Sequence, residues 1–242
     1  MRERLQAAAA RAGRPVPLLV AVTKTASPEQ ALELARLGQA DLGENRVQEL
    51  ERKLAHFAEE RARRCEVPPA RWHLIGHLQR NKARRAAAVC HAIHSLDSLA
   101  LGEALSRHVG EMHARGDLST EAHAPLSEVF VEIDYSGAAT RTGVPEDEAP
   151  GLVAALARLP GLRLAGLMTI APLPEFDGDV ARARRVFRAL RALSERLPRE
   201  HFVDGRARLS MGMTSDFEIA VEEESDVVRV GSALFAPEGA PR

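Results

Sequence analysis

Lysine is rare in this chain, and one of the three lysines stands where a primary amine could do chemistry. The chain has Lys24, Lys53 and Lys82, whereas 30 of its 33 basic residues are arginine. Lys24 follows the apolar, β-branched run 16–22 after one residue, Thr23. A side chain at the end of a buried strand is held rigidly while it faces a crevice. Unlike a guanidinium, a primary amine can lose its proton and form an imine with a carbonyl compound.

Two short turns late in the chain carry residues suited to binding phosphate. One is residues 210–216, with the sequence S-M-G-M-T-S-D, and the other is Gly231-Ser232. Glycine lets the backbone approach an anion closely, and the hydroxyls of Ser210 and Thr214 can donate to phosphate oxygens. Taken alone, each turn is more often a simple helix cap. Lys24 likewise has a plainer interpretation, as a cation that reaches into solvent or pairs with a carboxylate.

The chain alternates short apolar runs with longer amphipathic segments, which is the pattern of repeated βα units. Strands are predicted at 18–22, 40–43, 72–75, 92–94, 128–133, 164–168, 208–210 and 227–230. Helices are predicted at 2–12, 28–37, 47–60, 79–89, 98–115, 146–158, 180–196 and 216–223. We therefore expect an α/β fold, a single-domain (β/α)8 TIM barrel over residues 1–242 with an extra N-terminal helix. A doubly wound sheet would normally place a glycine-rich turn after its first strand, and none is present.

Functional groups of such barrels gather at the carboxyl ends of the strands. Polar residues follow nearly every predicted strand: Lys24, Glu44-Asn45, Gly76-His77, Ser95 with Asp97, Asp134-Tyr135-Ser136, Thr169, Ser210 and Ser232. The common phosphate site of this fold lies in the loops after strands seven and eight, where both glycine–hydroxyl turns fall. Together with an imine-forming lysine after strand one, they predict a phosphorylated aldehyde as the ligand.

Bulk composition excludes several classes of partner. Hydrophobic residues make up 45% and charged residues 28% of the 242 residues, and the formal net charge is -1. Such a charge predicts binding neither to nucleic acid nor to an anionic membrane. The N-terminus lacks the apolar core of a signal peptide, so a cytoplasmic protein is expected. Cys65, Cys90 and nine histidines show no metal-ligand spacing, so no metal site is predicted.

Longer stretches around these residues form a recurring set: 21–25 (AVTKT), 43–49 (GENRVQE), 72–82 (WHLIGHLQRNK), 94–97 (HSLD), 166–170 (GLMTI), 209–213 (LSMGM) and 228–235 (VRVGSALF). The set resembles the pyridoxal 5′-phosphate (PLP) homeostasis protein family, whose barrel is similar to the N-terminal domain of alanine racemase. The match spans nearly the whole chain. Two departures stand near the predicted site: Asp134 occupies a position where asparagine is common, and Thr214 one where serine is usual.

The resemblance implies a set of PLP-binding residues: Lys24 as the Schiff-base lysine, Asn45 beside the ring, Arg229 facing the pyridine nitrogen, and Ser210, Gly212, Thr214, Gly231 and Ser232 around the phosphate. A guanidinium does not give up its proton in proteins, so a pyridine nitrogen facing Arg229 stays unprotonated. An unprotonated ring is a poorer electron sink. Binding without turnover is therefore expected, and no catalytic residue is assigned.

The function expected from the resemblance is a PLP-binding protein of vitamin B6 homeostasis that holds PLP reversibly. The alternative is a low-activity amino-acid racemase. Alanine racemases take their second base from a C-terminal β domain, for which the chain beyond residue 230 has no room, and the only tyrosine, Tyr135, follows strand five. A class I aldolase-like barrel, whose lysine meets a substrate carbonyl, is a third interpretation.

Expected partners are PLP itself and PLP-dependent apoenzymes that receive it, and the chain is expected to be a monomer. Lys82 is either a helix-surface cation or a secondary site that receives the aldehyde. Lys53 has Glu49 four positions before it, and the pair is predicted to be a solvated helix contact.

Overall fold

The computed structural model describes residues 1–64, 67–116, 126, 128–137, 142–171 and 180–235. Within these ranges parallel strands form a closed barrel in chain order, with β1 closing against β8. The strands are β1 (Leu18–Val22), β2 (Asp41–Glu44), β3 (Arg71–Leu74), β4 (Ala92–Leu96), β5 (Glu128–Glu132), β6 (Leu164–Met168), β7 (Arg208–Ser210) and β8 (Val227–Val230). The (β/α)8 barrel expected from the sequence is confirmed.

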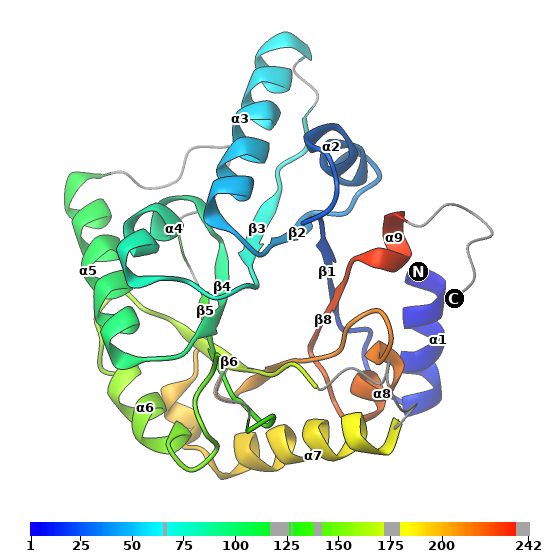
Figure 1. The fold of residues 1–242 in the computed structure, drawn as a ribbon, viewed down its shortest axis with the longest axis vertical. Coiled ribbons are helices and arrows are strands. Elements are labelled where there is room, and N and C mark those ends of the chain that lie inside the picture. Colours follow the sequence, from blue (N-terminus) through cyan, green and yellow to red (C-terminus); the bar gives the residue numbers. More distant parts are fainter. Residues whose placement is uncertain (65–66, 117–125, 127, 138–141, 172–179, 236–242) are drawn as a thin grey trace.

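Helices surround this ring of strands (Figure 1). They are α1 (Arg2–Ala12), α2 (Pro28–Arg36), α3 (Val47–Arg64), α4 (Ala83–Val89), α5 (Leu99–Arg115), α6 (Ala149–Leu156), α7 (Val180–Arg196), α8 (Phe217–Glu222) and α9 (Ser232–Phe235), with 3-10 turns at Arg80–Lys82 and Arg199–His201. The extra helix α1 precedes β1 and packs Leu5, Ala8 and Ala9 on Phe217 and Val221 of α8. None of the described helices is both long enough and apolar enough to cross a bilayer.

Four strands and two helices begin and end at the predicted residues: β1, β6, β7, β8, α1 and α7. The largest departures are at helix termini, and α3 extends to Arg64 instead of ending at residue 60. The helix predicted at 79–89 is split into the 3-10 turn Arg80–Lys82 and α4. Helix α6 begins at Ala149 instead of residue 146, with Pro150 in its first turn, where a proline loses no hydrogen bond.

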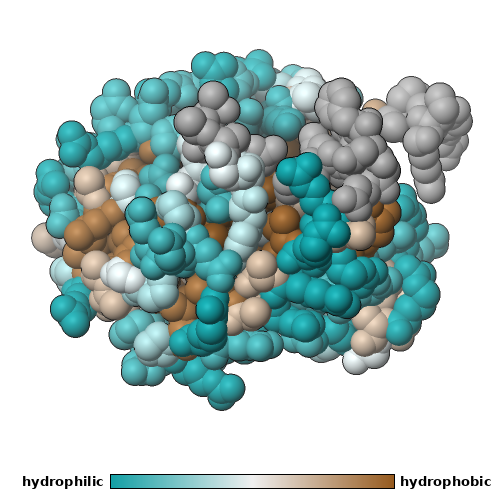
Figure 2. All heavy atoms as spheres, turned by 60° about the horizontal axis from the view of Figure 1, so that its bottom comes forward, coloured by the Kyte–Doolittle hydropathy of each residue, from teal (hydrophilic) through white to brown (hydrophobic). Residues whose placement is uncertain are grey.

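Apolar side chains pack in two layers, one inside the barrel and one between the barrel and the helices. The inner layer contains Val20, Phe130, Ala165, Met168 and Val227, all almost fully buried. The outer layer is larger, and helices α2 to α8 contribute buried apolar side chains to it. The side of the molecule that carries α7 is mostly hydrophilic, with apolar side chains visible between the polar ones (Figure 2). A rigid barrel of this kind fixes the loops at its carboxyl end, where the predicted site residues lie.

Candidate functional site

Lys24 lies in the turn that leads from β1 to α2. The turn is fixed at both ends: the Ala26 N–H donates to the Thr23 carbonyl at 2.8 Å, and Ser27 caps α2 through reciprocal hydrogen bonds with Gln30. The Lys24 side chain is exposed, and its amine has no hydrogen-bond or ion-pair partner among the residues that the structure describes. The backbone that carries this primary amine is therefore fixed, and the amine itself is free to react.

A buried ion pair supports this turn from below. Lys53 Nζ donates to the Thr23 carbonyl at 2.5 Å and to Glu44 Oε1, and the Thr23 hydroxyl donates to the same Glu44 oxygen at 2.6 Å. The Lys53 and Glu44 side chains are only 1% and 0% exposed. The predicted solvated Glu49–Lys53 contact is wrong, because Glu49 pairs with Arg52 instead. Within the described residues, Glu44 Oε2 has no hydrogen-bond partner.

The position of Lys53 on its helix explains this burial. Leu50 and Phe57 are buried on the same face of α3, and Lys53 lies between them at helical spacing. The sequence therefore held a signal for a buried lysine, namely a charged residue within an apolar stripe. A charge buried this deeply needs a partner, which β2 supplies as Glu44.

The two predicted phosphate turns lie side by side. The Ser232 hydroxyl donates to Thr214 Oγ1 at 3.1 Å, and the Arg229 N–H donates to the Gly212 carbonyl at 2.9 Å. Ser232 is exposed and Thr214 partly exposed. Two hydroxyls from separate loops thus meet at the carboxyl end of β7 and β8.

Both turns require glycine for steric reasons. Gly212 has φ +95°, and a Cβ there would lie 2.5 Å from the Ala220 Cβ. A Cβ on Gly231 would lie 3.1 Å from the backbone oxygen of Val22, which shows how closely the second turn approaches the end of β1. The Lys24 turn and the Gly231 turn are therefore neighbours, because β1 pairs directly with β8.

Arg229 and Ser210 are buried inside the barrel, beneath the turns. Arg229 donates through Nη1 to Ser210 Oγ at 2.5 Å and through Nη2 to the Thr169 carbonyl at 2.9 Å. Burial lowers the pKa of Arg229 to about 10, while Asp216 and Glu132 act in the opposite direction. The guanidinium is still protonated at neutral pH. Ser210 is also fully buried, and its hydroxyl contacts Arg229 and His94 inside the barrel.

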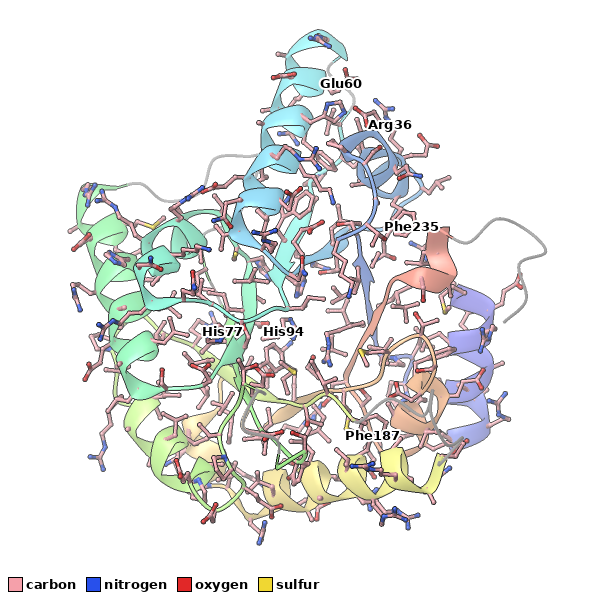
Figure 3. All side chains as sticks on the ribbon, in the orientation of Figure 1. Arg36, Glu60, His77, His94, Phe187 and Phe235 are labelled. Carbon is pink, nitrogen blue, oxygen red and sulfur yellow. The ribbon has the colours of Figure 1, made fainter. Side chains whose placement is uncertain are left out.

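A chain of buried polar side chains continues from Ser210 across the barrel, and sequence reasoning missed it. Ser210 Oγ lies 2.8 Å from His94 Nδ1, His94 Nε2 lies 2.9 Å from His73 Nδ1, and His73 Nε2 lies 3.0 Å from Asp41 Oδ1. His94 lies within the ring of strands in Figure 3. The only signal in the sequence was a histidine inside each of two apolar strands.

The opposite side of the rim carries further acidic and polar groups. His77 Nδ1 lies 3.1 Å from Asp97 Oδ2. Glu132, at the end of β5, accepts hydrogen bonds from the Thr142 hydroxyl at 3.1 and 3.2 Å, and burial raises its pKa. Asn45 is exposed directly after β2.

Cysteine and metal chemistry find little support in the structure. Cys90 is fully buried, and burial raises the pKa of its thiol, while Cys65 lies outside the described residues. Across the described ranges, no group of three or more histidine, cysteine, aspartate or glutamate side chains could hold a metal ion.

Comparison with known proteins places the chain in a family. Residues 1–238 match the family model described as alanine racemase, N-terminal domain. The pyridoxal phosphate homeostasis protein of Mycobacterium leprae is 40% identical over 98% of this chain and 90% of its own length. This chain belongs to the pyridoxal phosphate homeostasis protein family. The member from Escherichia coli K12 is 35% identical over 97% of this chain and 92% of its own length. The resemblance predicted from the motifs is confirmed.

A solved structure of the family has the same fold. PipY of Synechococcus elongatus, solved with PLP bound, is 31% identical and superposes with a TM-score of 0.76. The match covers 97% of this chain and 99% of PipY.

Proposed function

We propose that this homeostasis-family protein binds PLP reversibly on Lys24 and serves vitamin B6 homeostasis in the cytoplasm, without robust turnover of a substrate. Its family membership and the likeness to PLP-bound PipY support the proposal. The observation that carries it is the exposed Lys24 amine, which has no ionic partner among the described residues and stands beside the glycine turn at the end of β8.

The residues present fit PLP as a ligand. Bound PLP supplies an aldehyde that condenses reversibly with a primary amine, and Lys24 offers that amine. For the phosphate, the turns at Gly212 and Gly231, which pack closely on Ala220 and Val22, would offer backbone N–H groups, and Thr214 and Ser232 offer hydroxyl donors. Asn45 would lie beside the ring.

Ser210 has a different part in this proposal from the one predicted by its sequence motif. Its hydroxyl contacts Arg229 and His94 inside the barrel. We therefore assign it the task of holding Arg229 in place, and assign the phosphate contacts to the turns above it.

Weak catalysis follows from Arg229. Its guanidinium stays protonated at neutral pH, so it would donate a hydrogen bond to the pyridine nitrogen of bound PLP without transferring a proton to it. The ring then withdraws electrons less strongly, which disfavours carbanion chemistry. Weak catalysis by bound PLP fits a monomer that carries PLP and releases it to PLP-dependent apoenzymes.

An absorbance titration of the apoprotein with PLP tests the proposal. The wild type should develop a saturable visible band. Lys24→Arg keeps the positive charge but cannot form the imine, so it should lose the band, while Lys82→Arg should keep it. The proposal fails if the wild type shows no saturable band or if Lys24→Arg behaves like the wild type. Turnover of a D/L amino-acid pair that depends on Lys24 would replace the carrier role with a racemase.

A further inference from the structure

We propose that the buried chain Asp41–His73–His94–Ser210 is a positioning device that fixes the orientation of Arg229 at the cofactor site from the opposite end of the barrel. The inference rests on the proposed PLP function, because it assigns the chain a task at the same site.

The chain runs through the middle of the barrel. Asp41 is the first residue of β2, and Ser210 is the last residue of β7. His94 belongs to β4, which is not a neighbour of β7, so its 2.8 Å contact with Ser210 crosses the barrel interior. Phe130 stacks on the His94 ring with centroids 4.4 Å apart and planes 8° apart, which fixes the plane of the imidazole. The four residues are all at most 4% exposed.

With both imidazoles neutral, the donors and acceptors of the chain can be arranged in one direction only. An ionised Asp41 only accepts, so His73 Nε2 carries a proton and His73 Nδ1 is an acceptor. His94 Nε2 then donates to His73, which leaves His94 Nδ1 to accept the proton of the Ser210 hydroxyl. The lone pairs of Ser210 therefore face Arg229, which donates to them at 2.5 Å.

The charges around the chain keep this arrangement in place. Hydrogen bonds from His73 and Arg71 outweigh the burial of Asp41 and lower its pKa to about 2, so its carboxylate is ionised at neutral pH. Burial, followed by the nearby His73 and Arg229, holds the pKa of His94 well below its ordinary value. Arg208 and His91 act in the same direction on His94.

Two carboxylates partly balance the charge of Arg229. Asp216, from the loop after β7, and Glu132, from β5, are the acidic groups that act on it. Burial raises the pKa of both carboxyl groups. The cationic end of the chain therefore lies at the cofactor site, and the anionic end is Asp41.

The anionic end is paired with a cation at the protein surface. Arg71 binds Asp41 through Nε at 2.7 Å and Nη2 at 2.5 Å, and its side chain is 50% exposed. Both residues line a groove of about 540 Å³, with Arg2, Gln39 and the residues before β1. Removing the charge of Asp41, the carboxylate that His73 contacts, should therefore change the orientation of Arg229.

A pH titration of the visible band of the PLP-loaded protein tests the inference. His94→Phe keeps the stacking on Phe130 but breaks the chain, and Asp41→Asn removes the charge at its far end. If Arg229 is no longer held in place, the ring nitrogen of bound PLP can take up a proton. The positive charge on the ring then lowers the pKa of the conjugated imine, because a second proton nearby is disfavoured. We expect the midpoint to fall by about one pH unit, a tenfold change, in His94→Phe, and by less in Asp41→Asn.

Two controls separate this role from general destabilisation. Arg71→Gln breaks the same surface ion pair as Asp41→Asn but leaves the carboxylate under His73, and Phe187→Leu disturbs the core at α7, away from the chain. Both should titrate with the wild-type midpoint. The inference is overturned if Asp41→Asn also titrates like the wild type, or if either control shifts as far as Asp41→Asn. Asp41→Asn decides the matter if His94→Phe does not fold. A wild type without any visible band would instead refute the proposed function, and the inference with it.

Discussion

At the scale of single residues, the two most buried charged side chains among the described residues, Lys53 and Glu44, lie under the turn that carries Lys24. Lys53, Glu44 and Thr23 share hydrogen bonds below the turn that carries Lys24. Removing one partner of a buried pair leaves the other charge uncompensated, which is more costly than replacing both. The pair therefore fixes the turn and makes it sensitive to substitution.

Lys53→Met should lower the free energy of unfolding by about 3–5 kcal/mol, because Glu44 is left buried and unpaired. The double variant Lys53→Met with Glu44→Leu should lose clearly less than the single one. Urea unfolding followed by circular dichroism measures both. A loss below about 1 kcal/mol in the single variant would show that the pair is unimportant to stability.

Asp41 should give the protein a defined dependence on acid. Its pKa is about 2 in the folded protein against an ordinary 3.8. A depressed pKa stabilises the fold above the ordinary value, and this stabilisation, roughly 2 kcal/mol in full, is lost as the pH falls from about 4 towards 2. The difference in unfolding free energy between wild type and Asp41→Asn should therefore be about 1 kcal/mol smaller near pH 3 than near pH 6. An unchanged difference would contradict the shifted pKa.

At the scale of elements, the loops after β7 and β8 depend on close backbone approach. Gly212 and Gly205 both have positive φ, at +95° and +66°, but only Gly212 has neighbours that a Cβ would meet. Gly205→Ala therefore measures the strain of the backbone conformation alone, and Gly212→Ala adds the contact with Ala220. Affinity for PLP, measured by equilibrium dialysis, should fall at least tenfold in Gly212→Ala and stay near the wild type in Gly205→Ala. Equal affinities would remove this turn from the binding site.

The sequence predicted elements better than contacts. Strands could be located because a parallel barrel buries them on both faces and leaves apolar runs such as Leu18–Val22. The juxtaposition of the two glycine turns followed from the strand order. Lys53 was misjudged because local charge spacing was given more weight than the apolar stripe of α3. The contact between His94 and Ser210 joins residues 116 positions apart, and no local pattern encodes such a pairing.

At the scale of the whole molecule, the barrel closes by pairing β1 with β8. A ligand bound between the loops that follow these strands therefore contacts both the first and the last strand region of the fold. Ligand that binds only the folded state adds about 2.7 kcal/mol at a hundredfold excess over its Kd. Melting temperature should therefore rise with PLP concentration in the wild type and Lys82→Arg. Calorimetry on Lys24→Arg should show a much smaller rise, and a full rise would mean that covalent attachment adds little to binding.

The central claim is that Lys24 is the residue to which PLP attaches, and reductive trapping tests it most directly. The PLP-loaded protein is treated with borohydride, digested, and its peptides are mapped by mass spectrometry. We expect one reduced pyridoxyl group per chain, on the peptide that contains Lys24. Lys53 should stay unmodified because it is buried. A pyridoxyl group found mainly on Lys82, or on no lysine at all, would contradict the account.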